Sequence, residues 1–290
     1  MKLKNIVIFV LFIVFARANS QKIELRIGDI KVIQKEYSYN EKKYKNKIGK
    51  SEYYFDTSGN ILERISYGRH HYTRLNIIGE IEQFSYENDN LVLSKSYRSS
   101  CKSCDFFQLY TKYIYNNNRL KEENTYYSEN DSLFMAVNYV YNDSIKETHF
   151  NNNSTFYQKI YDSENRIIEF NQIFEDTNEI RWQWKYKYAD SCRTGNFQTY
   201  YGDGKENSKK EIEYFDSQGR IITEEIIDSY KTKLIYTYSK NGIIKEIKEY
   251  QSFGNEERYE LYYVAKFTTK GKVKKLNLEV VNKINEELIE

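Results

Sequence analysis

Aromatic and polar residues alternate along most of this chain, in short runs separated by clusters of small polar residues. A period of two is typical of β-strands that pack one face and expose the other to water. The clearest unit is Tyr-Phe-Asp-Ser-Gln-Gly-Arg-Ile-Ile at residues 214–222, and relatives of it stand at 54–62 and 160–168. Each combines an aromatic strand end, a polar turn and a branched apolar pair, so each predicts two strands joined by a turn.

The turn of this unit has a physical basis. Its Asp can hydrogen-bond the backbone two residues further on, which starts a turn. Three residues after the Asp stands Gly59, Asn165 or Gly219, and these residue types tolerate a positive φ. Looser copies and variable polar turns follow at intervals of roughly 20–30 residues, which indicates a repeat of two strands and two turns.

We therefore predict an all-β protein in which antiparallel β-hairpin repeats over residues 19–278 form a long twisted open sheet or a β-solenoid. One hairpin cannot bury its aromatic face alone, so neighbouring hairpins must stack. At the C-terminus the period changes, because Val280, Val281, Ile284 and Leu288 have helical spacing. We predict a short helix over residues 279–290 that caps the open end of the sheet; a docking helix for a partner is the alternative.

The N-terminus has the features of a secretory signal peptide at residues 1–18. Lys2 and Lys4 precede an apolar run of roughly ten residues, and Ala16-Arg17-Ala18 forms a small-residue cleavage site. The apolar run is short for a membrane span, and no later stretch is long and apolar enough to cross a membrane. The sequence thus predicts an exported protein, periplasmic, on the cell surface or secreted.

Composition agrees with a β-protein and excludes one class of partner. Of the 290 residues, 30 are Tyr and none is Pro. Aromatic residues favour sheets, and the lack of Pro removes one guard against edge pairing, so self-association through sheet edges is plausible. Loss of residues 1–18 removes three basic residues and no acid from 44 basic and 42 acidic residues, which leaves the mature chain near neutrality. Nucleic-acid binding is therefore not predicted.

The Tyr-Phe-Asp-x-x-Gly-Arg/Asn-Ile segments at 54–61 and 214–221 resemble the YD repeats of RHS-type proteins, and 161–167 matches them with Asn in place of Gly. The resemblance implies β-hairpin repeats of a cell-surface or secreted scaffold, sometimes linked with carbohydrate binding. Large RHS proteins also carry a toxin domain and a core motif, and neither is recognisable here. The exported, Tyr/Asn/Lys-rich character also resembles uncharacterised proteins of Bacteroidetes-type bacteria.

Cys101-Lys102-Ser103-Cys104 is the most specific short motif. In an exported chain, such a pair can form a redox centre, half of a zinc site or a local disulfide. Zinc would need two more ligands, and the chain has no second pair. A thioredoxin-like centre would need a helix start after a strand, whereas this motif lies in a variable turn. A disulfide between Cys101 and Cys104 is favoured, with Cys192 as the odd thiol and no metal site.

The run 181–188 is the second candidate site. In a strand, Trp182, Trp184, Tyr186 and Tyr188 share one face. Packed against the sheet, this face would form core, as large aromatic residues usually do. Exposed, it would form a platform for sugar rings or peptide side chains.

No catalytic or phosphate-binding motif is recognisable, and no pair of carboxylates is marked as an acid and a base. The sequence therefore predicts a protein without enzymatic activity or cofactor. Its expected function is an exported scaffold or binding module that engages an unknown protein or glycan at the cell surface. The alternative is a carbohydrate-binding or glycan-active protein that uses the 182–188 face.

Overall fold

The computed structural model describes residues 28–39, 45–67, 78–98, 107–151, 153–200, 208–252, 258–271 and 276–289, which contain 18 strands and one helix. The elements are β1 (Ile30–Tyr39), β2 (Lys45–Phe55), β3 (Ile61–Tyr67), β4 (Ile78–Glu87), β5 (Asn90–Arg98), β6 (Phe107–Asn116), β7 (Arg119–Tyr127), β8 (Leu133–Asn142), β9 (Ile145–Phe150), β10 (Thr155–Tyr161), β11 (Ile167–Phe174), β12 (Ile180–Ala189), β13 (Cys192–Thr199), β14 (Ser208–Phe215), β15 (Ile221–Ile227), β16 (Lys231–Tyr238), β17 (Ile244–Ser252), β18 (Glu260–Gly271) and α2 (Leu278–Ile289). The helix predicted at 279–290 is therefore shifted by one residue.

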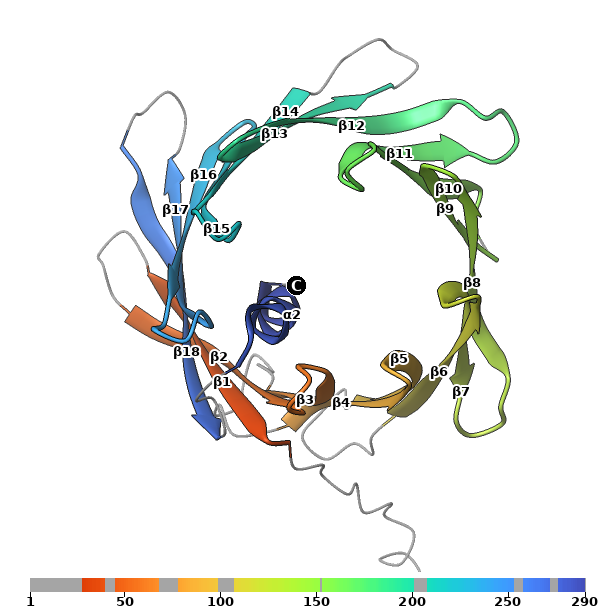
Figure 1. Cartoon of the computed structure of the whole chain (residues 1–290), viewed down its shortest axis with the longest axis horizontal. Coiled ribbons are helices and arrows are strands. Elements are labelled where there is room, and N and C mark those ends of the chain that lie inside the picture. Colours follow the sequence, from red (N-terminus) through yellow and green to blue (C-terminus); the bar gives the residue numbers. More distant parts are fainter. Residues whose placement is uncertain are drawn as a thin grey trace, which may run out of the picture.

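The strands form a closed barrel. Each strand pairs antiparallel with the next one along the chain, and β18 pairs with β1. Val32 of β1 lies opposite Tyr53 of β2 on one side and opposite Thr269 of β18 on the other. Both edges of β1 are thus hydrogen-bonded, and the strands surround a central space (Figure 1).

The closed ring overturns part of the sequence prediction. The all-β class and the short C-terminal helix are confirmed. The open twisted sheet or β-solenoid is wrong, and so is the assignment to an open YD-repeat array of the RHS type, because the last strand pairs with the first. The hairpin signals specify neighbouring strands only and leave this long-range pairing undetermined. Since no described strand has a free edge, the basis for self-association through sheet edges is also removed.

The tight turns that follow even-numbered strands lie together at one end of the barrel, because successive strands run antiparallel. In the turn between β14 and β15, the Asp216 carboxylate accepts hydrogen bonds from the backbone N–H of Gln218 at 2.9 Å and of Arg220 at 3.0 Å. Positive φ angles occur at Gly59 (82°), Asn165 (64°) and Gly219 (77°). The local turn chemistry is the one that the sequence pattern indicates.

An arginine in two of these turns also holds the following hairpin. Arg220 donates to Asp216 Oδ2 at 2.6 Å and lies 4.4 Å from the ring centre of Tyr238, whose hydroxyl donates to the carbonyl of Ile221 at 2.7 Å. Asp162, Arg166, Ile167 and Tyr188 repeat these contacts. Each such turn is therefore fastened to the hairpin that comes after it.

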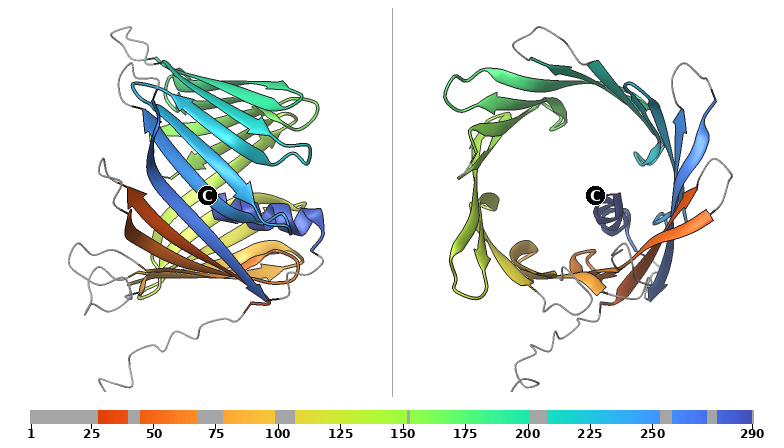
Figure 2. Two further views of the ribbon diagram at one scale, coloured as in Figure 1. Left: turned by 90° about the vertical axis from the view of Figure 1, so that its left-hand side faces the viewer. Right: turned by 180° about the vertical axis from the view of Figure 1, so that it is seen from behind.

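Helix α2 lies inside the ring, against the inner face of the wall and not at the end of a sheet (Figures 1 and 2). Its buried residues Val281, Ile284 and Leu288 form one hydrophobic core with wall residues from β1, β2, β17 and β18, among them Val32 and Phe267. The period of four seen in the sequence is the packed stripe of this helix.

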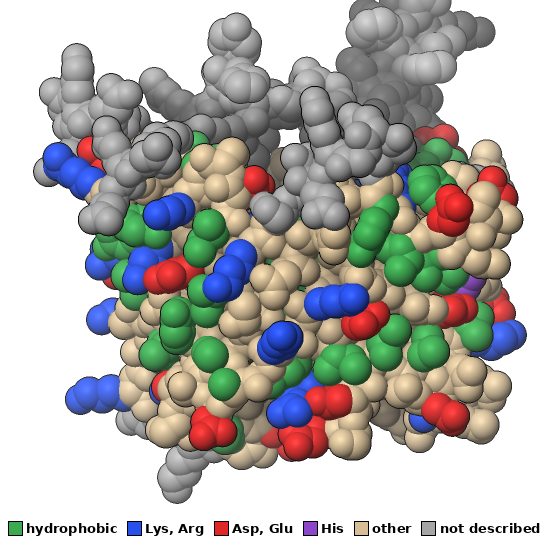
Figure 3. Space-filling view, turned by 90° about the horizontal axis from the view of Figure 1, so that it is seen from above, with side chains coloured by type: hydrophobic (Ala, Val, Ile, Leu, Met, Phe, Trp, Pro, Cys, Tyr) green, Lys and Arg blue, Asp and Glu red, His purple; other side chains and the backbone are tan. Residues whose placement is uncertain are grey.

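The contacts with α2 identify the inner face of the wall. Side chains alternate between the two faces of a strand, and residues paired across strands share a face. Tyr53 and Phe267 pack in the core with α2, so the residues in register with them point inward around the ring. The outer face carries ion pairs such as Lys31–Glu52 at 2.8 Å and Lys233–Glu225 at 2.8 Å. Figure 3 shows charged and hydrophobic side chains interspersed over the visible outer wall.

Candidate luminal binding site

The four aromatic residues of β12 point into the barrel. Trp182 lies opposite Thr199 and Trp184 opposite Phe197, on the face that the register assigns to the interior. Trp182, Trp184, Tyr186 and Tyr188 are all half-buried. The sequence left two interpretations open, a packed core and an exposed platform. Neither describes these side chains fully, because they are neither sealed in a core nor placed on the outside of the barrel.

Around these residues the inner wall forms a continuous group of rings, which we call the aromatic cluster. It comprises Tyr157, Phe170, Trp182, Trp184, Tyr186 and Phe197, from strands β10 to β13. The ring centres of Phe170 and Trp182 are 5.2 Å apart at a nearly perpendicular angle, and those of Trp184 and Phe197 are 5.1 Å apart. These distances are typical of favourable ring contacts. The sequence pattern found β12 alone; the other rings come from strands whose register it did not specify.

A glycine makes room for two of these rings. Gly195 of β13 lies opposite Tyr186, and the rings of Trp184 and Tyr186 stack with an interplanar angle of 7°. A Cβ atom at position 195 would stand 2.9 Å from Tyr186 Cε1 and 3.1 Å from Trp184 Cε3. The absence of a side chain therefore lets both rings lie against the backbone of β13.

Cross-strand pairing places part of the cluster in a straight row, which we call the luminal row. It runs over seven neighbouring strands, β8 to β14, and consists of Tyr141, Lys146, Lys159, Phe170, Trp184, Phe197 and Lys209. With neighbouring strands about 4.8 Å apart, it follows the wall for about 30 Å. Aromatic residues occupy its middle, and lysines stand on both sides of them.

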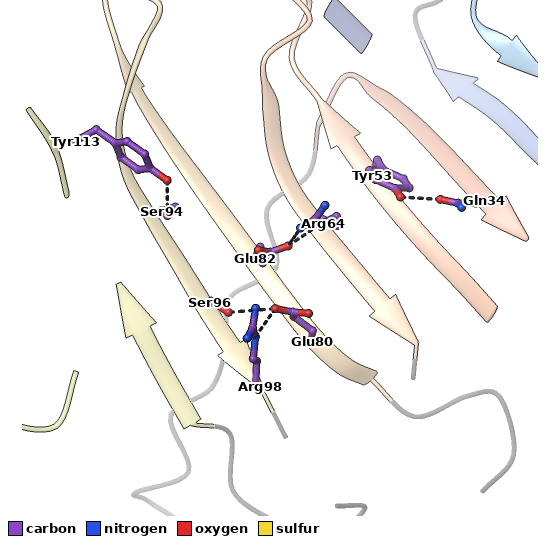
Figure 4. Close-up of polar contacts among 9 residues, drawn as sticks. All are labelled: Gln34, Tyr53, Arg64, Glu80, Glu82, Ser94, Ser96, Arg98 and Tyr113. Atoms are coloured by element: carbon purple, nitrogen blue, oxygen red, sulfur yellow. Dashed lines mark hydrogen bonds and ion pairs between the residues drawn. The ribbon is translucent and has the colours of Figure 1, made fainter. Parts of the chain in front are cut away.

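The inner wall of β1–β6 has a different character. There the polar side chains contact one another, as Figure 4 shows for Arg64 with Glu82, Tyr53 with Gln34 at 2.6 Å and Arg98 with Glu80 at 2.6 Å. Such mutual pairing satisfies polar groups within the wall. The apolar and unpaired surface of the lumen is therefore concentrated on β8–β14.

A carboxylate group lies next to the aromatic cluster on the inner wall. Arg193 bridges Glu211 at 3.2 Å and Glu213 at 2.5 Å, and Glu213 lies directly opposite Glu224. Burial raises the pKa of Glu213 to about 7, and Arg193 only partly offsets this rise while Glu211 and Glu224 add to it. Tyr236 donates to Glu224 at 2.9 Å.

The cysteine motif lies outside the described residues, so the disulfide between Cys101 and Cys104 stays a prediction. Cys192 at the start of β13 is a free thiol. Within the described ranges, no group of His, Cys, Asp and Glu side chains is arranged to hold a metal ion. In the same ranges, no helix has the length and apolar character needed to cross a membrane.

Comparison with known proteins yields matches to solved structures only, all at low identity. No family model matches the sequence, and no curated protein matches it. Among solved structures, a porin-like protein from Bacteroides uniformis aligns over 83% of this chain and 96% of its own, with 10% identity and a TM-score of 0.45. A TcdB2-TccC3-Cdc42 structure aligns over 78% of this chain and 13% of its own, with 10% identity and a TM-score of 0.41. A Bacteroides fragilis protein of unknown function covers 57% of this chain, with 10% identity and a TM-score of 0.21.

Proposed function

We propose that this chain is an exported, non-catalytic binding protein whose barrel takes a ligand into its lumen, against the aromatic cluster. The observation that carries the proposal is the distribution of side-chain chemistry over the wall. The aromatic cluster of β10–β13 lies on its inner face, and the outer face of the same strands carries mainly charged and amide side chains.

The outer face of the same strands is a ladder of polar groups. Gln158 donates to Glu147 at 3.0 Å, and Asn171 donates to Gln158 at 3.3 Å. Farther along the same outer face, Gln183 donates to Glu169 at 3.1 Å. A barrel that crosses a membrane has the opposite arrangement, with an apolar band outside and polar groups inside. We infer that this part of the outer wall faces water and that the aromatic cluster on its inner face is an apolar surface available for binding.

The size of the ring supports the same conclusion. Barrels of 16–18 strands enclose more space than side chains alone fill. The aromatic cluster remains half-buried although α2 occupies part of the interior. Contiguous exposed apolar surface of this kind usually marks a place where another molecule binds.

The mixture of rings and polar groups favours a carbohydrate over a purely apolar ligand. Next to the luminal row, the inner face carries Thr148, Tyr157, Gln172, Trp182 and Thr199 in cross-strand register. Rings supply flat apolar surface for the faces of sugar rings, and hydroxyl groups such as those of Thr148 and Tyr157 bind sugar hydroxyls. Gln172 is buried and donates to Thr155 and Tyr157, so it holds the neighbouring side chains in place. The carbohydrate-binding alternative of the sequence analysis therefore becomes the preferred ligand class.

The proposal can be tested by the fluorescence of Trp182 and Trp184, the two tryptophans of the chain. The mature protein would be titrated with cello-, malto-, chito- and galacturono-oligosaccharides while emission and quenching by acrylamide are recorded. We expect acrylamide to quench both tryptophans and one sugar to protect them. If every sugar leaves emission and quenching unchanged, lumen binding of carbohydrate is wrong.

A matched pair of variants tests which face of the wall binds the sugar. Phe197→Ala removes a ring from the cluster, whereas Tyr214→Ala removes one that points outward from β14. We expect the first to weaken sugar binding and the second to leave it unchanged, with thermal melts to show that both remain folded. Equal effects of the two variants would contradict the luminal site.

A further inference from the structure

Lysines without carboxylate partners stand on both sides of the rings in the luminal row. The ammonium of Lys159 lies 5.3 Å from the ring centre of Phe170, and that of Lys209 lies 5.7 Å from Trp184. Lys146 lies 4.5 Å from the ring centre of Tyr139. In the described part of the chain, none of these three lysines has a carboxylate within ion-pair distance.

Three arginines of the inner wall do have such partners. Arg64 pairs with Glu82, Arg98 with Glu80, and Arg193 with both Glu211 and Glu213. Charges in partly buried positions are usually paired in this way. The lysines of the luminal row therefore differ from these three arginines.

Two of these lysines repel each other. Lys146 of β9 lies directly opposite Lys159 of β10, and like charges in this position are unfavourable. Burial lowers the pKa of Lys146, and the charge of Lys159 lowers it further. Glu123, the acid whose charge acts on Lys146, already accepts a hydrogen bond from Tyr139 at 2.6 Å. An anion bound between the two lysines would relieve the repulsion.

A pocket adjoins this end of the row. It has a volume of ≈ 580 Å³, and its lining includes Arg119, Lys121, Tyr139 and Tyr141. The guanidinium of Arg119 lies 5.5 Å from the ring centre of Tyr141. A volume of this size is within the range of small-molecule sites. Of the two basic side chains that line it, Lys121 pairs with Glu122 at 2.8 Å, and Lys146 lies directly opposite the lining residue Tyr141.

We propose that the luminal ligand is an acidic oligosaccharide of the uronate class, with its sugar rings on Phe170, Trp184 and Phe197 and carboxylates at Lys146 and Lys159 and at Lys209. This inference rests on the proposed function and names the charge of its ligand. A single-stranded nucleic acid would also offer rings and negative charges. The near-neutral mature chain lacks the overall positive charge typical of nucleic-acid binding, so the sugar is favoured.

The test compares one sugar with its methyl ester, in which every carboxylate has lost its charge. A hexamer of galacturonic acid and its fully methyl-esterified form would be titrated against the mature protein by calorimetry, at low and high salt. A single-stranded oligothymidylate of matched charge would be the third probe. We expect the acid to bind at least about tenfold more tightly than the ester, because hydrogen bonds to charged groups typically contribute that much. Added salt should reduce this preference.

Lysine variants test whether the luminal row causes the preference for the acid over the ester. Lys146→Gln and Lys159→Gln should each remove most of the preference for the acid and leave binding of the ester unchanged. Lys185→Gln, on the exposed outer face of β12, is the matched control and should retain the preference.

Three outcomes would contradict the inference about the acidic ligand, and one of them would also contradict the proposed function. Equal binding of acid and ester would refute the inference about charge and leave the proposed function intact. Tighter binding of the oligothymidylate than of the acid would replace the ligand class. Binding of none of the three probes would count against both this inference and a luminal carbohydrate site.

Discussion

Asn285 of α2 hydrogen-bonds the backbone of Ile244 at the start of β17. Its Oδ1 accepts from the Ile244 N–H at 2.9 Å, and its Nδ2 donates to the carbonyl of Gly242 at 3.0 Å. One side chain thereby satisfies a donor and an acceptor of the turn between β16 and β17. The helix is held inside the barrel by directional contacts as well as by apolar packing.

Replacement of Asn285 by Ala should therefore destabilise the protein. The buried N–H of Ile244 would lose its partner, and an unsatisfied buried group typically costs about 1–3 kcal/mol. Urea unfolding would measure the loss. Glu286→Ala, at the exposed neighbouring position, should change the unfolding free energy by less than about 0.5 kcal/mol. Similar losses for both variants would show that the contact with β17 is unimportant.

Two glycines with similar backbone angles allow the contact of α2 with the wall to be measured separately from backbone strain. Gly59 has a φ of +82° and Gly219 one of +77°, so an Ala at either position is strained by about 1–2 kcal/mol. A Cβ atom at Gly59 would stand 3.1 Å from the Val280 carbonyl oxygen, whereas one at Gly219 would meet nothing within 4 Å. We expect Gly59→Ala to lower the unfolding free energy more than Gly219→Ala, and to increase proteolysis near α2. Equal effects would mean that α2 does not press on this turn.

Glu213 should make stability depend on pH. Its pKa is raised from 4.5 to about 7 in the folded barrel, so the folded state holds the proton more tightly than the unfolded chain does. The stabilisation is complete below about pH 4.5 and is lost as the pH rises through about 7. The unfolding free energy of the wild type should therefore fall between pH 5 and pH 8, and that of Glu213→Gln should fall less. Parallel pH profiles for the two proteins would show that groups other than Glu213 cause the pH dependence of the unfolding free energy.

The sequence by itself determined the local structure, because the interactions concerned span few residues. Asp216 and Gly219 specify their turn through contacts within five residues, and the alternation in 181–188 fixes that Trp182 and Trp184 share a face. The stripe of Val281, Ile284 and Leu288 likewise predicted a helix. These are consequences of backbone hydrogen bonding and of side-chain periodicity.

Only the tertiary structure decided which way those faces point. Pairing of β1 with β18 joins residues from opposite ends of the chain, and no local pattern specifies it. Once the sheet closes, one face of each strand becomes an interior. The row in which neighbouring strands pair Trp184 with Phe170, Phe170 with Lys159 and Lys159 with Lys146 then faces that interior. Alternation says which residues share a face; the curvature of the whole sheet says whether that face encloses a lumen.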